Sequence, residues 1–203
     1  MTNKVRFPCG DIELEGLLSE GEPKRGVVAT HPHPLYGGDM RNPVVETVAD
    51  AYARRGLASL RFNFRGVGQS EGTYDDGRGE MDDLRAAIDF LRERGIRNID
   101  VAGYSFGAWV AARTDLEAAG ADRLILISPP VDFLSFADVD RLPRLALTVV
   151  GDEDDFGAAD RVRELAAKWN PEARFEIIPD ADHFFWGRFR ELGEVVAGAL
   201  FGG

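Results

Sequence analysis

The chain has 203 residues, 44% of them hydrophobic, which suits one globular domain spanning residues 1–203 with a core of its own. Its 35 acidic residues outnumber the 24 basic ones, and the resulting net charge of −11 repels phosphate backbones and anionic lipid surfaces. We therefore expect no nucleic-acid partner and no membrane partner.

Targeting and cysteine signals point to the cytoplasm. Nothing near Met1 resembles a signal peptide, and no apolar run approaches the roughly 20 residues of a membrane span. The single Cys9 cannot form an internal disulfide, which agrees with a reducing compartment. We expect a cytoplasmic protein, and the sequence does not fix its oligomeric state.

Hydrophobic periodicity predicts the order of elements. Alternating residues 5–7 and 12–18 flank a turn at residues 8–11 and indicate an antiparallel hairpin at one edge of a sheet. From Val27 onward strand patterns alternate with helical ones. Apolar residues recur at helical spacing within residues 44–52, 81–91 and 162–169. This alternation predicts an α/β fold with a mostly parallel sheet, helices on both faces, and functional loops at the carboxyl ends of the strands.

Two loops in the first half of the chain resemble known binding motifs, but each lacks a feature that its motif requires. His31 and His33 are spaced as a metal pair, but no cysteine or carboxylate at ligand spacing accompanies them, so we expect no metal there. We expect His31 instead to pack beneath the functional loops at the ends of the strands. In the Gly-rich loop of residues 66–72 the third glycine comes one residue too late for a dinucleotide fingerprint. We expect no cofactor there. Arg65, at the start of that loop, is a candidate for binding a carboxylate.

Residues 103–107 read Gly-Tyr-Ser-Phe-Gly, between an apolar strand pattern and a helical one. A serine on such a sharp turn projects its hydroxyl out of the sheet, and small residues two positions before and after it prevent backbone clashes. The context makes Ser105 a candidate nucleophile. A hydroxyl needs a neighbouring base and an acid that orients the base.

Four carboxylates follow the β-branched run of residues 145–150 and compete for the role of the acid. In sequences of this pattern the acid usually stands three residues after the glycine, here Gly151. That spacing selects Asp154, with Asp155 second and Asp152 third. The other carboxylates are expected to complement a helix N-terminus.

His183 is expected to be the base. His31 and His33 precede the serine, so His183 alone fits the chain order serine, acid, histidine. It follows the apolar residues 175–178, in a loop where such a base belongs.

These motifs together resemble the α/β-hydrolase superfamily, and within it the small lidless esterases and dienelactone-hydrolase-like proteins. The resemblance covers nearly the whole chain and is carried by residues 31–38, 61–72, 103–107, 151–156 and 183–185. It implies a single-domain α/β-hydrolase fold with an N-terminal antiparallel hairpin. Only a short helix fits between the segments ending at Ser128 and starting at Leu145, so no large lid is expected. The fold does not define the substrate, because it hosts many chemistries.

The oxyanion of the reaction needs two backbone N–H donors. Phe106, the residue after the nucleophile, supplies one. Where the superfamily commonly has His-Gly, this chain has His31 followed by proline, so the second donor is less securely assigned by analogy. Proline has no N–H, which leaves His33 as the best second donor and Leu35 or Tyr36 as fallbacks.

An open site without a lid should be bordered by apolar side chains. Those expected there are Leu35, Tyr36, Phe106, Phe133, Phe184, Phe185 and Trp186, of which Leu35, Tyr36, Phe184 and Trp186 are our substrate-binding candidates. We expect a serine hydrolase that cleaves a carboxylic ester or related acyl bond of a small molecule. Thioesterase or peptidase activity on the same triad, and an inactive hydrolase-fold binding protein, are the alternatives.

Overall fold

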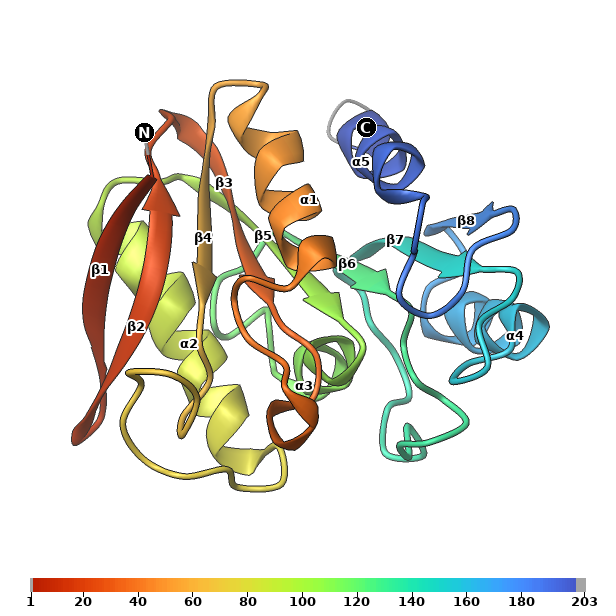
Figure 1. The fold of residues 1–203 in the computed structure, drawn as a ribbon, viewed down its shortest axis with the longest axis horizontal. Helices are drawn as coiled ribbons and strands as arrows, with labels where there is room; N and C mark the ends of the chain where they lie inside the picture. The colour runs from red at the N-terminus through yellow and green to blue at the C-terminus, as the bar shows by residue number, and fades with distance from the viewer. Residues whose placement is uncertain (1, 200–203) are drawn as a thin grey trace.

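A computed structural model of the protein describes residues 2–199. Eight strands form one sheet in the order β1-β2-β4-β3-β5-β6-β7-β8 (Figure 1). The strands are β1 Thr2–Cys9, β2 Ile12–Ser19, β3 Glu22–Thr30, β4 Leu57–Phe62, β5 Asn98–Tyr104, β6 Arg123–Ile127, β7 Leu145–Gly151 and β8 Arg174–Ile178. The helices are α1 Pro43–Ala53, α2 Arg78–Glu93, α3 Phe106–Arg113, α4 Ala159–Trp169 and α5 Phe189–Ala199, and a short 3-10 helix, η1, covers Pro34–Tyr36.

The predicted hairpin at the sheet edge is confirmed. Strands β1 and β2 pair antiparallel from Thr2↔Ser19 to Cys9↔Ile12, around a turn in which Gly10 has a φ of 59°. The first strand is longer than expected, because Pro8 continues it. Proline is tolerated on an edge strand, where its missing N–H interrupts no internal ladder.

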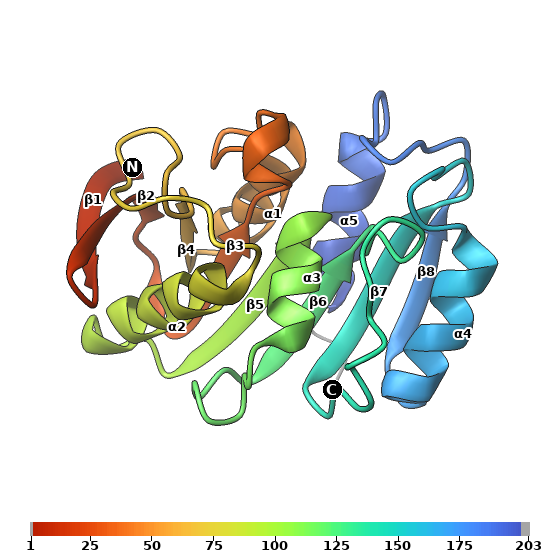
Figure 2. The same ribbon diagram turned by 90° about the horizontal axis from the view of Figure 1, so that it is seen from below.

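The hairpin joins the rest of the sheet through an antiparallel pairing of β2 with β4. The six remaining strands, from β4 to β8 in the order given, pair parallel with one another. Figure 2 shows α2, α3 and α4 on one face and α1 and α5 on the other. Each face has its own buried apolar cluster, so the central strands are apolar on both sides. The expected fold class is confirmed; that residues 1–203 make up one domain stays a prediction.

The parallel strands end at one edge of the sheet, and the loops that leave it there carry the candidate residues. Between β6 and β7 the chain makes turns without any helix, so the short helix allowed for in this segment is absent. No helix within residues 2–199 has the length and apolar character needed to cross a membrane.

A buried charge cluster lies toward the amino-terminal ends of the central strands, opposite the loops that carry the candidate residues. Asp100 in β5 is fully buried, and its carboxylate accepts hydrogen bonds from Arg25 in β3 (2.9 Å), Arg123 in β6 (2.8 Å) and the Tyr52 hydroxyl in α1 (2.6 Å). Burial, followed by the charge of Asp100, raises the pKa of Tyr52 well above its ordinary value, so the phenol stays a donor. The cluster joins three strands and a helix.

Replacing Asp100 with asparagine should lower the free energy of unfolding by about 3 kcal/mol, because two guanidinium groups lose their counter-charge in a buried setting. Urea titration measures the loss. Asp89→Asn is the matched control, since Asp89 is 65% exposed and pairs with Arg92 at 3.5 Å. That change should cost less than about 1 kcal/mol. Equal losses in the two variants would contradict a structural role for the cluster.

Candidate active site

Ser105 occupies the sharp turn between β5 and α3, as the sequence predicts. Its φ of 54° lies in the left-handed region, and its N–H donates to the carbonyl of Ile127 at 3.0 Å. A Cβ on Gly103 would lie 2.5 Å from the carbonyl oxygen of Gly107, and a Cβ on Gly107 would lie 2.8 Å from that of His31. The two glycines therefore let three backbone segments meet around the serine.

The structure brings the three predicted triad residues together. His183 Nε2 lies 2.9 Å from Ser105 Oγ, and His183 Nδ1 lies 2.9 Å and 3.0 Å from the two carboxylate oxygens of Asp154. All three side chains are buried, with residue exposures of 9% for the serine, 4% for the histidine and 5% for the aspartate. With Nδ1–H donating to the carboxylate, Nε2 is free to accept the serine proton.

Asp154 is the acid that reaches the histidine. Its Oδ1 also accepts backbone N–H bonds from Phe156 (2.9 Å) and Gly157 (3.2 Å), which fix the carboxylate in place. The competing carboxylates of Asp152 and Asp155 belong to exposed residues. Burial thus distinguishes Asp154 from the two neighbouring aspartates and gives a physical reason for the choice that the spacing after Gly151 suggested.

The loop after β3 narrows the choice of oxyanion donors. The N–H of Leu35 donates to His33 Nδ1 at 3.2 Å, and that of Tyr36 donates to the His33 carbonyl at 3.1 Å, so both fallback donors are engaged within the loop. Among residues 2–199, no hydrogen bond uses the N–H of His33 or of Phe106. The rings of these two residues lie 4.8 Å apart. Their role as the donor pair stays a prediction.

His31 packs beneath the site, as expected. Its Nδ1–H donates to the Pro32 carbonyl at 2.6 Å, and its Nε2 accepts the N–H of Phe64 at 3.1 Å, so both ring nitrogens are engaged by the backbone. Burial lowers the pKa of His31 to about 4, which keeps the ring neutral. Within the described part of the chain, no three His, Cys, Asp or Glu side chains gather as a metal site.

Arg65 and the Gly-rich loop have structural roles. The Arg65 guanidinium does bind a carboxylate, but it is that of the buried Asp83 in α2, at 2.7 Å. In the loop, the Ser70 hydroxyl donates to the Asn63 carbonyl at 2.7 Å and accepts the N–H of Glu15 at 3.0 Å. These bonds tie the loop to the end of β4 and to β2.

Five of the seven apolar side chains expected to border the site are exposed, and their place in substrate binding stays a prediction. Phe133 and the four substrate-binding candidates are exposed: Leu35 66%, Tyr36 86%, Phe133 68%, Phe184 47% and Trp186 66%. The expectation for Phe106 and Phe185 is wrong, because their exposures are 1% and 0%. Phe106 turns into the core beneath α2 and α3, and Phe185 into the core beneath α1 and α5.

Two residues that the sequence did not identify hold the histidine loop. The ring of Phe156 stacks on the imidazole of His183, with centroids 4.3 Å apart and an interplanar angle of 25°. The hydroxyl of Tyr104 donates to the His183 carbonyl at 3.0 Å. Tyr104 directly precedes the serine, a position that hints at a role, whereas nothing in the sequence pattern signals the stacking of Phe156.

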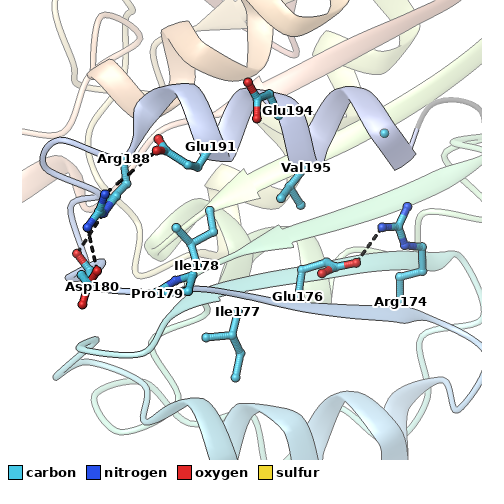
Figure 3. A pocket seen from close by; sticks show the side chains of 11 residues that line it. Arg174, Glu176, Ile177, Ile178, Pro179, Asp180, Arg188, Glu191, Glu194 and Val195 are labelled. Carbon is cyan, nitrogen blue, oxygen red and sulfur yellow. Dashed lines mark hydrogen bonds and ion pairs between the residues drawn. The ribbon is translucent and has the colours of Figure 1, made fainter.

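One groove on the surface lies away from the triad. A groove of about 550 Å³ runs between β8 and α5 (Figure 3). Its charged side chains pair with each other, Arg174 with Glu176 at 2.6 Å and Arg188 with Asp180 at 2.8 Å. Because no triad residue lines it, the groove belongs to the packing of the last strand and helix rather than to the chemistry at Ser105.

Comparison with known proteins identifies the family. The model of the alpha/beta hydrolase family matches residues 29–148. An uncharacterized protein of Rickettsia prowazekii (strain Madrid E) is 35% identical in an alignment 205 positions long, which covers 95% of this chain and 86% of the relative. The chain belongs to the alpha/beta hydrolase family.

Solved structures agree. An alpha-beta serine hydrolase homologue from Coxiella burnetii is 35% identical, with a TM-score of 0.88 over 98% of each chain. A member of the a/b serine hydrolases without lid, from Xanthomonas campestris, is 31% identical, with a TM-score of 0.87 over 98% of this chain and 93% of its own. The resemblance to lidless proteins of this family, expected from the motifs, is confirmed.

The stabilising effect of His31 should depend on pH. The folded state holds this imidazole neutral down to a pKa of about 4, whereas the unfolded chain takes up the proton near 6.5. The contribution is therefore complete above pH 6.5 and declines as the pH falls to about 4, by about 3 kcal/mol in total. Urea unfolding of the wild type and His31→Asn at roughly pH 7 and roughly pH 4 tests this. The wild type's advantage should shrink at the lower pH, and a constant advantage would contradict the assignment.

Proposed function

We propose that the protein is a serine hydrolase that cleaves a carboxylic ester or related acyl bond of a small molecule. The observation that carries the proposal is the chain of hydrogen bonds from Asp154 through His183 to Ser105, 2.9 Å at each link. Kinship with serine hydrolase homologues at 31% and 35% identity supports the same class of chemistry. The single cysteine, which agrees with a reducing compartment, favours the cytoplasm as its location.

The reaction passes through an acyl-enzyme. Ser105 Oγ forms a bond to the carbonyl carbon while its proton moves to His183 Nε2, and Asp154 stabilises the resulting imidazolium. The bond from carbon to the leaving group breaks as Nε2 gives the proton to the departing atom. A water then gives a proton to Nε2 as its oxygen attacks the acyl carbon, and Ser105 Oγ regains the proton as the acid departs. Protons move only among chain, substrate and water, so the scheme needs no cofactor.

We assign the stabilisation of the negative charge that develops on the carbonyl oxygen to the N–H groups of Phe106 and His33. Removing one such donor from an oxyanion hole costs about 10²–10³ in kcat in a well-studied protease. Both N–H groups lack a hydrogen-bond partner among residues 2–199, and the rings of the two residues lie 4.8 Å apart, Phe106 directly following the serine. Donors that are free of other partners and held by the backbone need little reorganisation on meeting the oxyanion.

The same steps apply to thioesters, lactones and peptides, and an inactive hydrolase-fold binding protein would share the fold. A fluorophosphonate probe separates the enzyme from the binding protein. Stoichiometric labelling of Ser105 supports the hydrolase, whereas folded protein that stays unlabelled would favour binding without catalysis. A panel of acyl esters and thioesters of graded chain length then defines the acyl group.

Ser105→Ala and His183→Ala should each lower kcat for ester hydrolysis by about 10³-fold or more, since triad members act as a unit. Initial rates on an acetate ester measure the loss, and circular dichroism checks that the variants fold. Ser19→Ala, on β2 and away from the triad, is the control and should keep its activity. Near wild-type kcat in either triad variant with a normal spectrum would overturn the assignment.

Asp154→Asn should depress kcat far more than Asp155→Asn or Asp152→Asn, because an amide at this position favours the wrong imidazole tautomer. In a serine-protease triad the equivalent change costs about 10⁴ in kcat. The exposed Asp155 and Asp152 should change kcat by less than about 2-fold, the scale of a weak surface charge effect. Measuring kcat of the three variants at saturating substrate identifies which aspartate is the acid. A larger loss in Asp155→Asn would shift the acid by one residue and leave the hydrolase intact.

A further inference from the structure

All the exposed large hydrophobic side chains of residues 2–199 lie on three loops at the carboxyl ends of the strands, those after β3, β6 and β8. They are Leu35, Tyr36, Phe133, Phe184 and Trp186. Exposed large apolar side chains gathered in one region mark a binding surface, because each forgoes the stabilisation that burial would give it. Ring contacts join Phe133 and Phe184 to the histidine side of the site, and Tyr36 to the loop after β3. Trp186 packs instead against Phe189 of α5.

The part on the histidine side is a column of rings. Phe133 stacks on Phe156 with centroids 4.6 Å apart, and Phe156 stacks on His183 at 4.3 Å, both at an interplanar angle of 25°. Phe184 packs its ring across the edge of the same column, 5.5 Å from His183 and 6.0 Å from Phe156. On the other side, Tyr36 lies against His33, 4.8 Å away, over the oxyanion loop.

Backbone contacts hold this column in place. The N–H of Asp132 donates to the Phe156 carbonyl at 3.1 Å, and the Asp132 carboxylate accepts the N–H of Ala158 at 3.0 Å, so the loops after β6 and β7 are tied together. The Asp182 carboxylate accepts the N–H of Phe184 at 3.0 Å. The rings are therefore preorganised, which spares the ordering entropy that a mobile surface loses on binding.

The chemistry of the proposed reaction indicates which part of the substrate lies beside this column of rings. His183 Nε2 gives its proton to the leaving atom, so the leaving group must sit beside the imidazole when the acyl-enzyme forms. We propose that Phe133, Phe156 and Phe184 form the leaving-group subsite and that it takes a planar aromatic, uncharged alcohol. The inference rests on the proposed serine hydrolase function and adds the substrate class. His183 and Phe133 cover the two faces of Phe156, so the leaving group meets the ring edges of the column and the exposed ring of Phe184. Such edge and ring contacts favour an aromatic partner over a saturated one of similar size.

Charge excludes an anionic leaving group. The loops that carry the column also carry Glu153 and Asp155, both exposed, and within residues 2–199 neither is in an ion pair. Two other carboxylates on these loops are paired, Asp132 with Arg161 at 2.5 Å and Asp180 with Arg188 at 2.8 Å. Together with the net charge of −11, these carboxylates repel phosphate-bearing or carboxylate-bearing leaving groups.

The test compares esters that share the acetyl group and differ in the alcohol: benzyl acetate and cyclohexylmethyl acetate. Both give the same acetyl-enzyme, so kcat/KM reports the step in which the alcohol leaves. The wild type should favour the benzyl ester by about 3- to 10-fold, the size of an aromatic stacking preference. Phe133→Leu, which keeps an apolar side chain at this exposed position, should bring the ratio close to 1. Phe175→Leu on β8, outside the column, is the matched control and should keep the wild-type ratio.

Fluorophosphonate labelling tests the hydrolase activity separately from the aromatic subsite. Labelled wild type that hydrolyses both esters with the same ratio as labelled Phe133→Leu would overturn the aromatic subsite and leave the hydrolase standing. Wild type that is neither labelled nor active would overturn both. Benzyl acetate should also be preferred over its 4-carboxylate derivative, and Glu153→Gln with Asp155→Asn should narrow that gap. A preference for the anionic ester would overturn the uncharged leaving group.

Discussion

The close packing of backbone around Ser105 is the constraint on which the rest of the site depends. A non-glycine residue at a φ of 54° costs on the order of 1–3 kcal/mol and persists only where its surroundings over-determine it. Here they do, because Gly103 and Gly107 let the end of β5, the start of α3 and the loop after β3 approach within contact distance. The turn that strains the serine also brings the end of β3 and the loop after it up to the serine. One feature thus positions the candidate nucleophile and the loop that carries the proposed donor His33.

Much of this could be predicted from the sequence, and the reasons differ by element. The parallel strands are buried on both faces and read as apolar runs, while α1, α2 and α4 show a regular helical period. Both signals are local and survive in a single sequence. The geometry around Ser105 was predictable because a sharp strand-to-helix turn needs glycines at fixed offsets. His183 followed from chain order, since the other two histidines precede the serine.

What could not be predicted depends on contacts between distant segments. Spacing after Gly151 selected Asp154, but the burial of this carboxylate against His183, 29 residues away, is a contact that no local pattern records. The stacking of Phe156 on that histidine and the opposite burial of Phe184 and Phe185 arise from how two loops meet. The side chain of Phe185 turns inward because the backbone there adopts a positive φ of 56°, which breaks any simple periodicity. Fold and triad are therefore largely local information, and the substrate surface is not.

The buried charges around Asp100 have a consequence for how the protein can change. They join β3, β5 and β6 toward the amino ends of the strands, and Arg123 adds a hydrogen bond to the carbonyl of Ala199, at the end of α5, at 2.8 Å. At about 3.3 Å per residue, Asp100 and Ser105 are separated by on the order of 15 Å along the strand. Stability and recognition thus occupy opposite ends of the sheet. Mutational libraries confined to the loops after β3, β6 and β8 can alter selectivity while the anchor that keeps the scaffold folded stays intact.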